Sequence, residues 1–317
     1  MRLVEVEGTH TQHVDLQSID VHVGQSYSVL LTADQAATDY YFVVYTPFTP
    51  EKVLLTTAVL HYANQSARRP VFRDFRPPDH LNWSIHQARS IKTNLTAYGA
   101  RLSEQGSYNY GKKNISRTIT LANSVVPVAG KLMFAVNGVS FVDPETPLLL
   151  ADHFNISGVY APGSMPAAPP PTAAGAGEFR PETAVMGASF REFVEIVLQN
   201  NEKTLQTFHI NGHNFFVVGM GWGGWNRANR TAYNLKDAVA RVTTQVYPES
   251  WTAIYVALDS VGIWNVRSEH WERKYLGQQF YLKVASNSSE INDKIPKNTL
   301  LCGKAAAAGG STPPPSA

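Results

Sequence analysis

LQTFHINGHNFFVVGMG (residues 205–221) and GIWNVRSEHWERKYLGQQFYL (residues 262–282) are the two most informative stretches of this chain. The first follows FREFVEIVLQN (190–200), which has the length and the branched and aromatic residues of a buried strand. The second continues TAIYVALDSVGIWNVRSEH (252–270), which has the same character. We predict that both stretches are strands of one β-rich domain.

The N-terminal part also has the pattern of strands. Apolar and polar residues alternate over 3–8 and over 19–34, where a Gly-Gln pair marks a turn, and further strands are predicted over 39–48 and 53–62. Tyr, Phe, Trp, Val and Thr are plentiful, as in half-buried sheets. An all-β fold built from sandwich domains is therefore expected.

Composition limits the possible functions. The 317 residues allow about two domains, and the net charge of +2 argues against a nucleic-acid partner. No apolar run approaches the roughly 18 residues of a membrane span, so no transmembrane segment is expected.

The two opening stretches resemble the copper-ligand strands of the last cupredoxin domain in blue multicopper oxidases, which read H-P-x-H-L-H-G-H and H-C-H-I-x-x-H-x-x-x-G-M. D-V-H-V-G-Q-S-Y-S-V-L-L-T-A-D (20–34) resembles the middle domain of that family, and A-V-N-G-V-S-F (135–141) resembles the opening of the last domain. S-x-N-Y-G-K-K-N-I-S-R-T-I (107–119) resembles the plant skewed-growth and pollen-type monocopper oxidase-like proteins, the ascorbate oxidase homologues.

The resemblance implies two Greek-key cupredoxin-like β-sandwich or barrel domains. We expect an N-terminally truncated middle domain over 1–66, a basic connector over 67–115 and a C-terminal domain over 116–302. Within the last domain, the Pro- and Ala-rich segment 163–180 is expected to be a disordered loop. The tail 303–317 is expected to be disordered as well.

The same resemblance assigns positions to the copper ligands. Copper in these enzymes needs imidazoles and one thiolate. The positions of the blue centre are taken by Gln206, Ser268, Arg273 and Gln278. Those of the trinuclear cluster on this domain are taken by His209, Asn211, Arg267 and Glu269. We expect no blue centre and no cofactor. We also expect Arg267 and Glu269, two apart on one strand face, to fill the vacated space, either as an ion pair with each other or each paired with a close neighbour.

His209 is the one retained ligand position, and we interpret it as a hydrogen-bonded core histidine. The alternative is an adventitious Cu or Zn site that pairs it with His213. His270 is expected to be a packed or surface residue. The tryptophans are expected mainly in the core, with a sugar-stacking role of the Trp222/Trp225 loop as the alternative.

Several features predict a secreted glycoprotein. Seven N-x-S/T sequons occur, at Asn64, Asn82, Asn94, Asn114, Asn155, Asn229 and Asn287. No signal peptide follows Met1, which we interpret as an internal methionine of a longer protein. The family resemblance implies that the single Cys302 forms a disulfide with the missing N-terminal cupredoxin domain, the alternative being a harmless free thiol.

The basic stretch 68–117 could bind acidic cell-wall polysaccharide by charge attraction, or it could be only a solvated connector. The leading functional hypothesis is a non-catalytic cell-wall or pollen growth protein. The alternatives are a copper-dependent oxidoreductase that acts on ascorbate or phenolics, and a fragment without an independent role.

Overall fold

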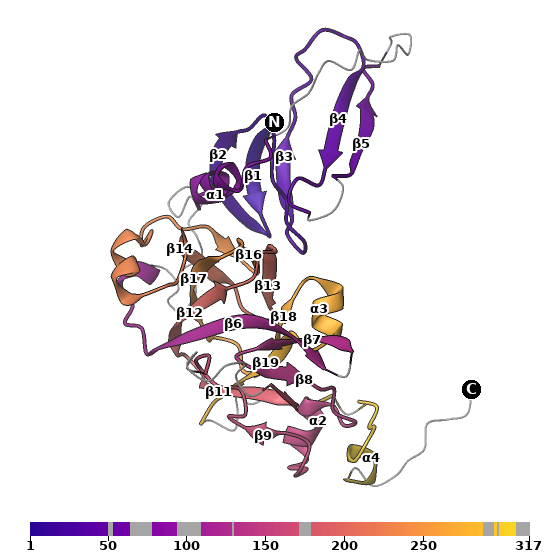
Figure 1. Cartoon of the computed structure of the whole chain (residues 1–317), viewed down its shortest axis with the longest axis vertical. Coiled ribbons are helices and arrows are strands. Elements are labelled where there is room, and N and C mark those ends of the chain that lie inside the picture. The colour runs from indigo at the N-terminus through magenta and orange to yellow at the C-terminus, as the bar shows by residue number, and fades with distance from the viewer. Residues whose placement is uncertain are drawn as a thin grey trace, which may run out of the picture.

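The computed structural model describes residues 1–49, 53–63, 78–93, 109–128, 130–170, 179–287, 295–296 and 298–308. Its strands form two small N-terminal sheets and a larger two-layered sandwich (Figure 1). The expected all-β fold with cupredoxin-like sandwich architecture is confirmed.

The N-terminal part holds one three-stranded sheet and one hairpin. The sheet has the order β2-β1-β3, and the hairpin joins β4 to β5. Their bounds are β1 Arg2–Val6, β2 Thr9–Asp15, β3 Tyr27–Leu30, β4 Tyr40–Tyr45 and β5 Leu55–Leu60. Apolar side chains such as Leu30, Phe42 and Leu55 stay exposed on these strands.

The first layer of the sandwich is an eight-stranded sheet of order β10-β8-β7-β6-β12-β17-β14-β15. The bounds are β6 Arg117–Val128, β7 Lys131–Val136, β8 Val139–Phe141, β10 Arg180–Glu182, β12 Phe193–Asn200, β14 Phe215–Trp222, β15 Ala240–Arg241 and β17 Ser250–Ala257. Strand β12 runs parallel to β6 and antiparallel to β17.

The second layer is a six-stranded sheet of order β16-β13-β18-β19-β11-β9. The bounds are β9 Ala161–Pro162, β11 Ala184–Ser189, β13 Gln206–Ile210, β16 Thr243–Val246, β18 Gly262–Ser268 and β19 Gln279–Ala285. Residues 205–221 and 262–282 thus contribute the neighbouring strands β13 and β18.

The main core lies between the two layers. Ile196 and Ile254 from the first layer and Phe208 and Phe280 from the second belong to one buried cluster. Strand β17 is buried on both faces, because a second cluster that includes Trp251 covers the outer side of the first layer. Burial on both faces explains why this strand reads as a continuous apolar run rather than an alternating one.

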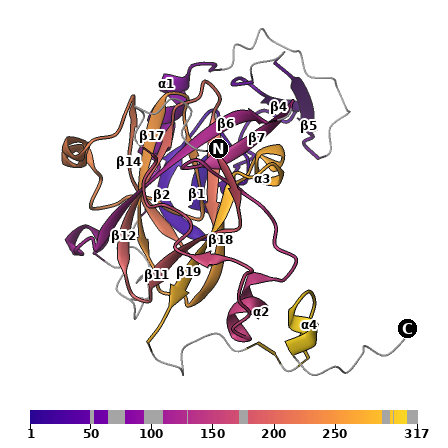
Figure 2. The same ribbon diagram turned by 60° about the horizontal axis from the view of Figure 1, so that its bottom comes forward.

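Short helices lie around the sheets, and α4 lies beside α2 (Figure 2). Their bounds are α1 Leu81–Ser90, η1 Tyr110–Lys112, α2 Leu148–His153, η2 Arg227–Ala232, α3 Trp271–Tyr275 and α4 Ala305–Ala308. Helix α1 links the N-terminal part to the sandwich, since Gln87 donates to the Ser18 carbonyl (2.8 Å) and Ile85 packs with Tyr247.

Hydrogen bonds and a buried ion pair also join the N-terminal sheet to the sandwich. Arg241 Nη1 lies 3.3 Å from Glu7 Oε1, and both side chains are 3% exposed. The other oxygen of Glu7 accepts backbone hydrogen bonds from Val242 (2.6 Å) and Thr243 (3.1 Å). Gln25 donates to Gln245 (2.7 Å). These contacts place the turn at Gly24 over the ends of β13 and β18.

The structure corrects several expectations. The polar segment Thr9–Asp15 is a strand that the sequence analysis missed, whereas 19–23 is not a strand. The expected disordered loop 163–180 is ordered at its start, because Met165 is buried in the main core. The expected disordered tail begins with helix α4, where Ala305 is fully buried and Lys304 N donates to Thr146 (2.9 Å). The rest of that loop and tail lies largely outside the described residues.

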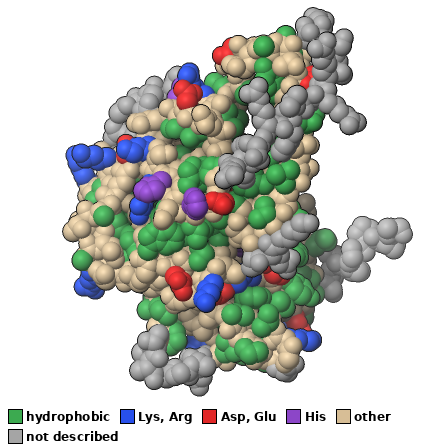
Figure 3. Space-filling view, turned by 45° about the horizontal axis from the view of Figure 1, so that its top comes forward, with side chains coloured by type: hydrophobic (Ala, Val, Ile, Leu, Met, Phe, Trp, Pro, Cys, Tyr) green, Lys and Arg blue, Asp and Glu red, His purple; other side chains and the backbone are tan. Residues whose placement is uncertain are grey.

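The low charge content is visible on the surface. Figure 3 shows hydrophobic side chains in several patches, with only scattered charged groups between them. Among the described residues, no helix combines the length and the apolar character needed to cross a membrane.

Candidate functional site

The candidate site is built on two neighbouring strands, and their register determines which side chains face each other. Strands β13 and β18 are antiparallel, with Phe208 opposite Ser268 and His209 opposite Arg267. Side chains on the two faces of this pair therefore gather into two separate clusters.

The first cluster lies where the N-terminal sheet meets the sandwich, and we call it the junction cluster: His209, Asn211, Thr243, Arg267 and Glu269. Arg267 Nη2 lies 2.9 Å from Glu269 Oε1, and its Nη1 donates to Asn211 Oδ1 (2.7 Å). The side chains of Arg267 and Glu269 are 19% and 20% exposed. The expected ion pair is confirmed.

His209 belongs to the junction cluster by two contacts. Its Nδ1 is 2.8 Å from Thr243 Oγ1 and 3.9 Å from Glu269 Oε1. Burial lowers the pKa of His209, and the nearby positive charge of Arg267 lowers it further, although Glu269 opposes both effects. The imidazole is therefore neutral at pH 7 and acts as a hydrogen-bonded side chain.

The N-terminal sheet covers part of the junction cluster. Gly24 has a φ of +81°, and a Cβ atom at this position would lie 2.5 Å from Glu269 Cγ. Glycine permits both the positive φ and the close approach. The Glu269 carboxylate is thus packed under a turn of the other part of the chain.

The second cluster is on the opposite face and is more deeply buried. We call it the buried cluster: Glu202, Thr204, Gln206, Arg273 and Gln278. Gln206 and Gln278 are fully buried, and Gln278 Nε2 donates to Gln206 Oε1 (3.2 Å). Arg273 Nη1 donates to Gln278 Oε1 (3.1 Å) and its Nη2 lies 2.6 Å from Glu202 Oε2.

Two members of the buried cluster were missed by the sequence analysis. Glu202 supplies the counter-charge for Arg273, and Thr204 Oγ1 accepts from Gln206 (3.0 Å) and Arg273 (3.2 Å). The sequence contained a signal for Glu202, because a buried arginine requires an acidic partner and Glu202 stands in the turn just before β13. Ser268, the fourth position that the resemblance assigns to the blue centre, is fully buried, but its Oγ accepts from His270 N (3.2 Å).

These donor sets do not fit copper. The buried cluster offers a guanidinium, amides, a hydroxyl and one carboxylate already paired with the guanidinium. The junction cluster offers one imidazole and one ion-paired carboxylate beside another guanidinium, which would repel a cation. Within the described ranges, no group of three His, Cys, Asp or Glu side chains is placed to share a metal ion.

His213 lies beyond the end of β13 and has different neighbours from His209. Its side chain is fully buried, 3.6 Å from Asp259 Oδ1 and edge-on to Trp264. His270 precedes α3, where burial lowers its pKa and Glu272 lies 3.9 Å away.

The tryptophans do not all lie in the core. Trp251 is buried, and Trp225 donates to Tyr233 (2.7 Å) within the second core cluster. In contrast, Trp222 is 44% exposed and Trp271 is 72% exposed. The expectation of mainly core tryptophans is therefore wrong for these two.

The remaining candidate residues lie mostly on the surface. Cys302 is exposed and has no disulfide partner within the described residues. Asn229 is half-buried and accepts from Asn226 N (2.7 Å). The exposed sequon asparagines are Asn82, Asn114, Asn155 and Asn287, whereas Asn64 and Asn94 lie outside the described residues.

Much of the basic stretch 68–117 also lies outside the described residues. Of its described members, Lys92 lies 3.6 Å from Asp237 and Arg117 lies 3.4 Å from Glu192. Arg89 donates to the Met220 carbonyl. These three cations contact the fold itself.

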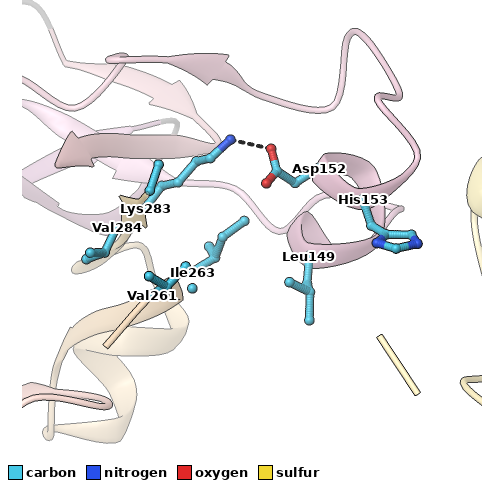
Figure 4. Close-up of a pocket in the computed structure, with 9 residues that line it drawn as sticks. Leu149, Asp152, His153, Val261, Ile263, Lys283 and Val284 are labelled. Atoms are coloured by element: carbon cyan, nitrogen blue, oxygen red, sulfur yellow. Dashed lines mark hydrogen bonds and ion pairs between the residues drawn. The ribbon is translucent and has the colours of Figure 1, made fainter. Parts of the chain in front are cut away.

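A separate cavity of about 270 Å³ lies between α2 and the start of β18 (Figure 4). Asp152 and Lys283 form an ion pair on its wall, and Tyr160 donates to Asp152 (3.0 Å). The cavity contains no residue of either cluster, and its one ion pair leaves little net charge for a ligand.

Comparisons with known proteins agree with this architecture. Two family models, both described as multicopper oxidase, match residues 1–65 and 145–290. The solved structure of Fet3p, described as a multicopper oxidase that functions in iron import, superposes with a TM-score of 0.68 at 17% identity. That match covers 94% of this chain and 54% of Fet3p, and it supports the fold alone.

Several curated plant proteins are similar to this chain. An L-ascorbate oxidase homolog of Nicotiana tabacum is 43% identical over 96% of this chain, and Monocopper oxidase-like protein SKS2 of Arabidopsis thaliana is 40% identical over 95%. L-ascorbate oxidase of Cucurbita maxima is only 27% identical. The chain spans about half the length of these relatives, 55%, 52% and 52% respectively.

The matched models cover well over half of the chain, and they include the strands that carry both clusters. The chain therefore belongs to the multicopper oxidase family, and within it resembles the ascorbate oxidase homologues and monocopper oxidase-like proteins more than the L-ascorbate oxidases.

Proposed function

We propose that this protein is a non-catalytic, secreted cell-wall or pollen growth glycoprotein whose copper-ligand positions have been converted into structural clusters. One observation carries the proposal. Gln206, Arg273 and Gln278, which the family resemblance assigns to the blue centre, converge as expected for a ligand set but bind one another. Arg273 places its guanidinium, paired with Glu202, in this group.

The junction cluster supports the same conclusion. His209 is the one imidazole among the four positions that the resemblance assigns to the trinuclear cluster. The Arg267–Glu269 ion pair lies beside it, and the low pKa of His209 follows in part from that arginine. Electron transfer from a substrate through this domain would require a thiolate and imidazoles that these positions lack.

The higher identities are to proteins named as a homolog of L-ascorbate oxidase or as monocopper oxidase-like, rather than to L-ascorbate oxidase itself. Secretion is supported by the exposed sequon asparagines. A disulfide from Cys302 to an N-terminal cupredoxin domain of a longer chain, and an acidic cell-wall polysaccharide as the partner, belong to the same proposal.

Metal analysis tests the proposal. The purified protein is incubated with Cu²⁺, dialysed and analysed for bound copper, for absorbance near 600 nm and for oxygen uptake with ascorbate. We expect less than one tightly held copper per chain, no blue band and no uptake above that of His209→Gln. Stoichiometric copper together with ascorbate-dependent uptake would instead assign a copper-dependent oxidoreductase.

The matched control restores the ligands. A variant that carries Gln206→His, Ser268→Cys, Arg273→His and Gln278→Met, together with Glu202→Gln to remove the unpaired charge, supplies the donors of a blue centre. A blue band in this variant and not in the natural sequence would attribute the difference to these side chains rather than to the scaffold.

A further inference from the structure

Helix α3 carries two of the most exposed large side chains among the described residues. Trp271 is 72% exposed and Tyr275 is 77% exposed. They are four residues apart on a helix, so both rings project from the same face. The helix lies at the edge of the sandwich, beside β18 and β7 (Figure 1).

The opposite face of α3 is fixed by the buried cluster. Arg273 is 8% exposed, pairs with Glu202 at 2.6 Å and lies over the Phe134 ring at 4.5 Å from its centroid. Phe134 N also donates to the Leu276 carbonyl at the end of the helix (2.9 Å). The two rings are thus presented on a rigid support, which lowers the entropy cost of binding a ligand there.

A cation accompanies the rings. Lys274 Nζ lies 5.1 Å from the centroid of the Trp271 ring, within the range of a cation–π contact. Among the described residues, no carboxylate lies within ion-pair distance of Lys274, whereas the neighbouring Glu272 lies 3.9 Å from His270. Trp271, Tyr275 and Lys274, which we call the platform, therefore combine two aromatic rings with an ammonium group that can take a new anionic partner.

We propose that Trp271, Tyr275 and Lys274 bind an acidic polysaccharide through its uronate rings, a site that rests on the non-catalytic function proposed above. The apolar C–H face of a pyranose ring stacks on an aromatic ring. A ring that carries a carboxylate also pairs with Lys274. Stable protein partners need about 800 Å² from each side, which a helix of five residues does not supply alone.

The test compares binding of polygalacturonate by the 317-residue protein and by Trp271→Ala/Tyr275→Ala, using calorimetry at low salt. Loss of both stacking contacts should weaken binding by about tenfold or more. The matched control is Trp222→Ala, which removes another exposed indole from β14 and should leave the affinity unchanged. Melting curves of the unaltered protein and of Trp271→Ala/Tyr275→Ala should coincide, since both replaced rings are largely exposed.

Lys274→Gln separates charge from stacking. This variant should lose most of the preference for polygalacturonate over its methyl ester, and the salt dependence of binding should become weaker. Retained stacking should leave the affinity for the methyl ester close to that of the unaltered protein.

The outcomes are distinguishable. The platform is overturned if the double variant binds polygalacturonate as tightly as the unaltered protein, or if the unaltered protein does not bind it. Neither result changes the outcome of the metal analysis that tests the proposed function. Reduced self-association of the double variant with unchanged polysaccharide binding overturns the platform in favour of a protein contact. Copper-dependent oxygen uptake overturns the non-catalytic function even if the double variant loses polysaccharide binding.

Discussion

The buried cluster and the junction cluster lie on opposite sides of strand β13 but are stabilised differently. Gln206 and Gln278 are fully buried, and Arg273 contacts Glu202, Thr204 and Gln278. In the junction cluster, Arg267 and Glu269 are about a fifth exposed and are covered in part by the turn at Gly24. The charged groups of the buried cluster are stabilised by their hydrogen-bond partners, whereas those of the junction cluster are stabilised by water as well.

This difference predicts different tolerance to substitution. A charge that is removed from water needs every hydrogen-bond partner in place, so losing one partner penalises the rest. A charge that keeps contact with water can be solvated again when its partner is lost. The same kind of substitution should therefore be costly in the buried cluster and mild in the junction cluster.

The largest effect is expected for Arg273→Met. The change leaves the Glu202 carboxylate without its counter-charge and removes a donor from Gln278, which should lower the free energy of unfolding by about 3–5 kcal/mol. Urea denaturation followed by tryptophan fluorescence measures the loss. Adding Glu202→Gln should recover much of it, because the uncompensated charge is then gone. A double variant no more stable than Arg273→Met would show that the charge pair is not the reason.

A smaller effect is expected for the matched change Arg267→Met in the junction cluster. Glu269 becomes solvated, and Asn211 loses one donor, so the free energy of unfolding should fall by about 1 kcal/mol or less. The same urea experiment gives the comparison with Arg273→Met directly. Equal losses for the two variants would contradict the distinction between the clusters.

The sequence predicted the parts of this architecture that depend on local pattern. Strands β12 and β17 follow from apolar runs, and the pairing of Arg267 with Glu269 follows from their spacing on one face. Strand β2 was missed because THTQHVD is polar and is held largely by pairing with β1. Tertiary pairing of this kind overrides local β-propensity.

From the sequence, only part of the set of residues that form the candidate site could be predicted. The family motif located Gln206, Arg273 and Gln278, but it carries no information on Glu202 or Thr204, which stand outside the ligand positions. The exposure of Trp271 was also not predictable, since the same WERKY segment would bury its tryptophan if α3 were rotated. The packing of Arg273 under the helix and the hydrogen bond from Phe134 N to the Leu276 carbonyl fix that rotation.

The smallest effect concerns pH. The pKa of His209 is lower in the folded protein than its ordinary value of 6.5, so the folded state binds this proton more weakly than the unfolded state does. The stability should therefore be complete above about pH 6.5 and should decline as the pH falls below that value, since protonation places a second positive charge beside Arg267.

His209→Gln retains a hydrogen-bonding group for Thr243 but cannot be protonated, so its melting temperature should fall less between pH 7 and pH 5. His270, whose pKa is lowered by burial as well, leaves a residual dependence in the variant, so the slope should be reduced rather than abolished. An unchanged slope would mean that the proton on His209 does not distinguish the folded from the unfolded chain, and that water reaches the junction cluster more freely than its one-fifth exposure implies.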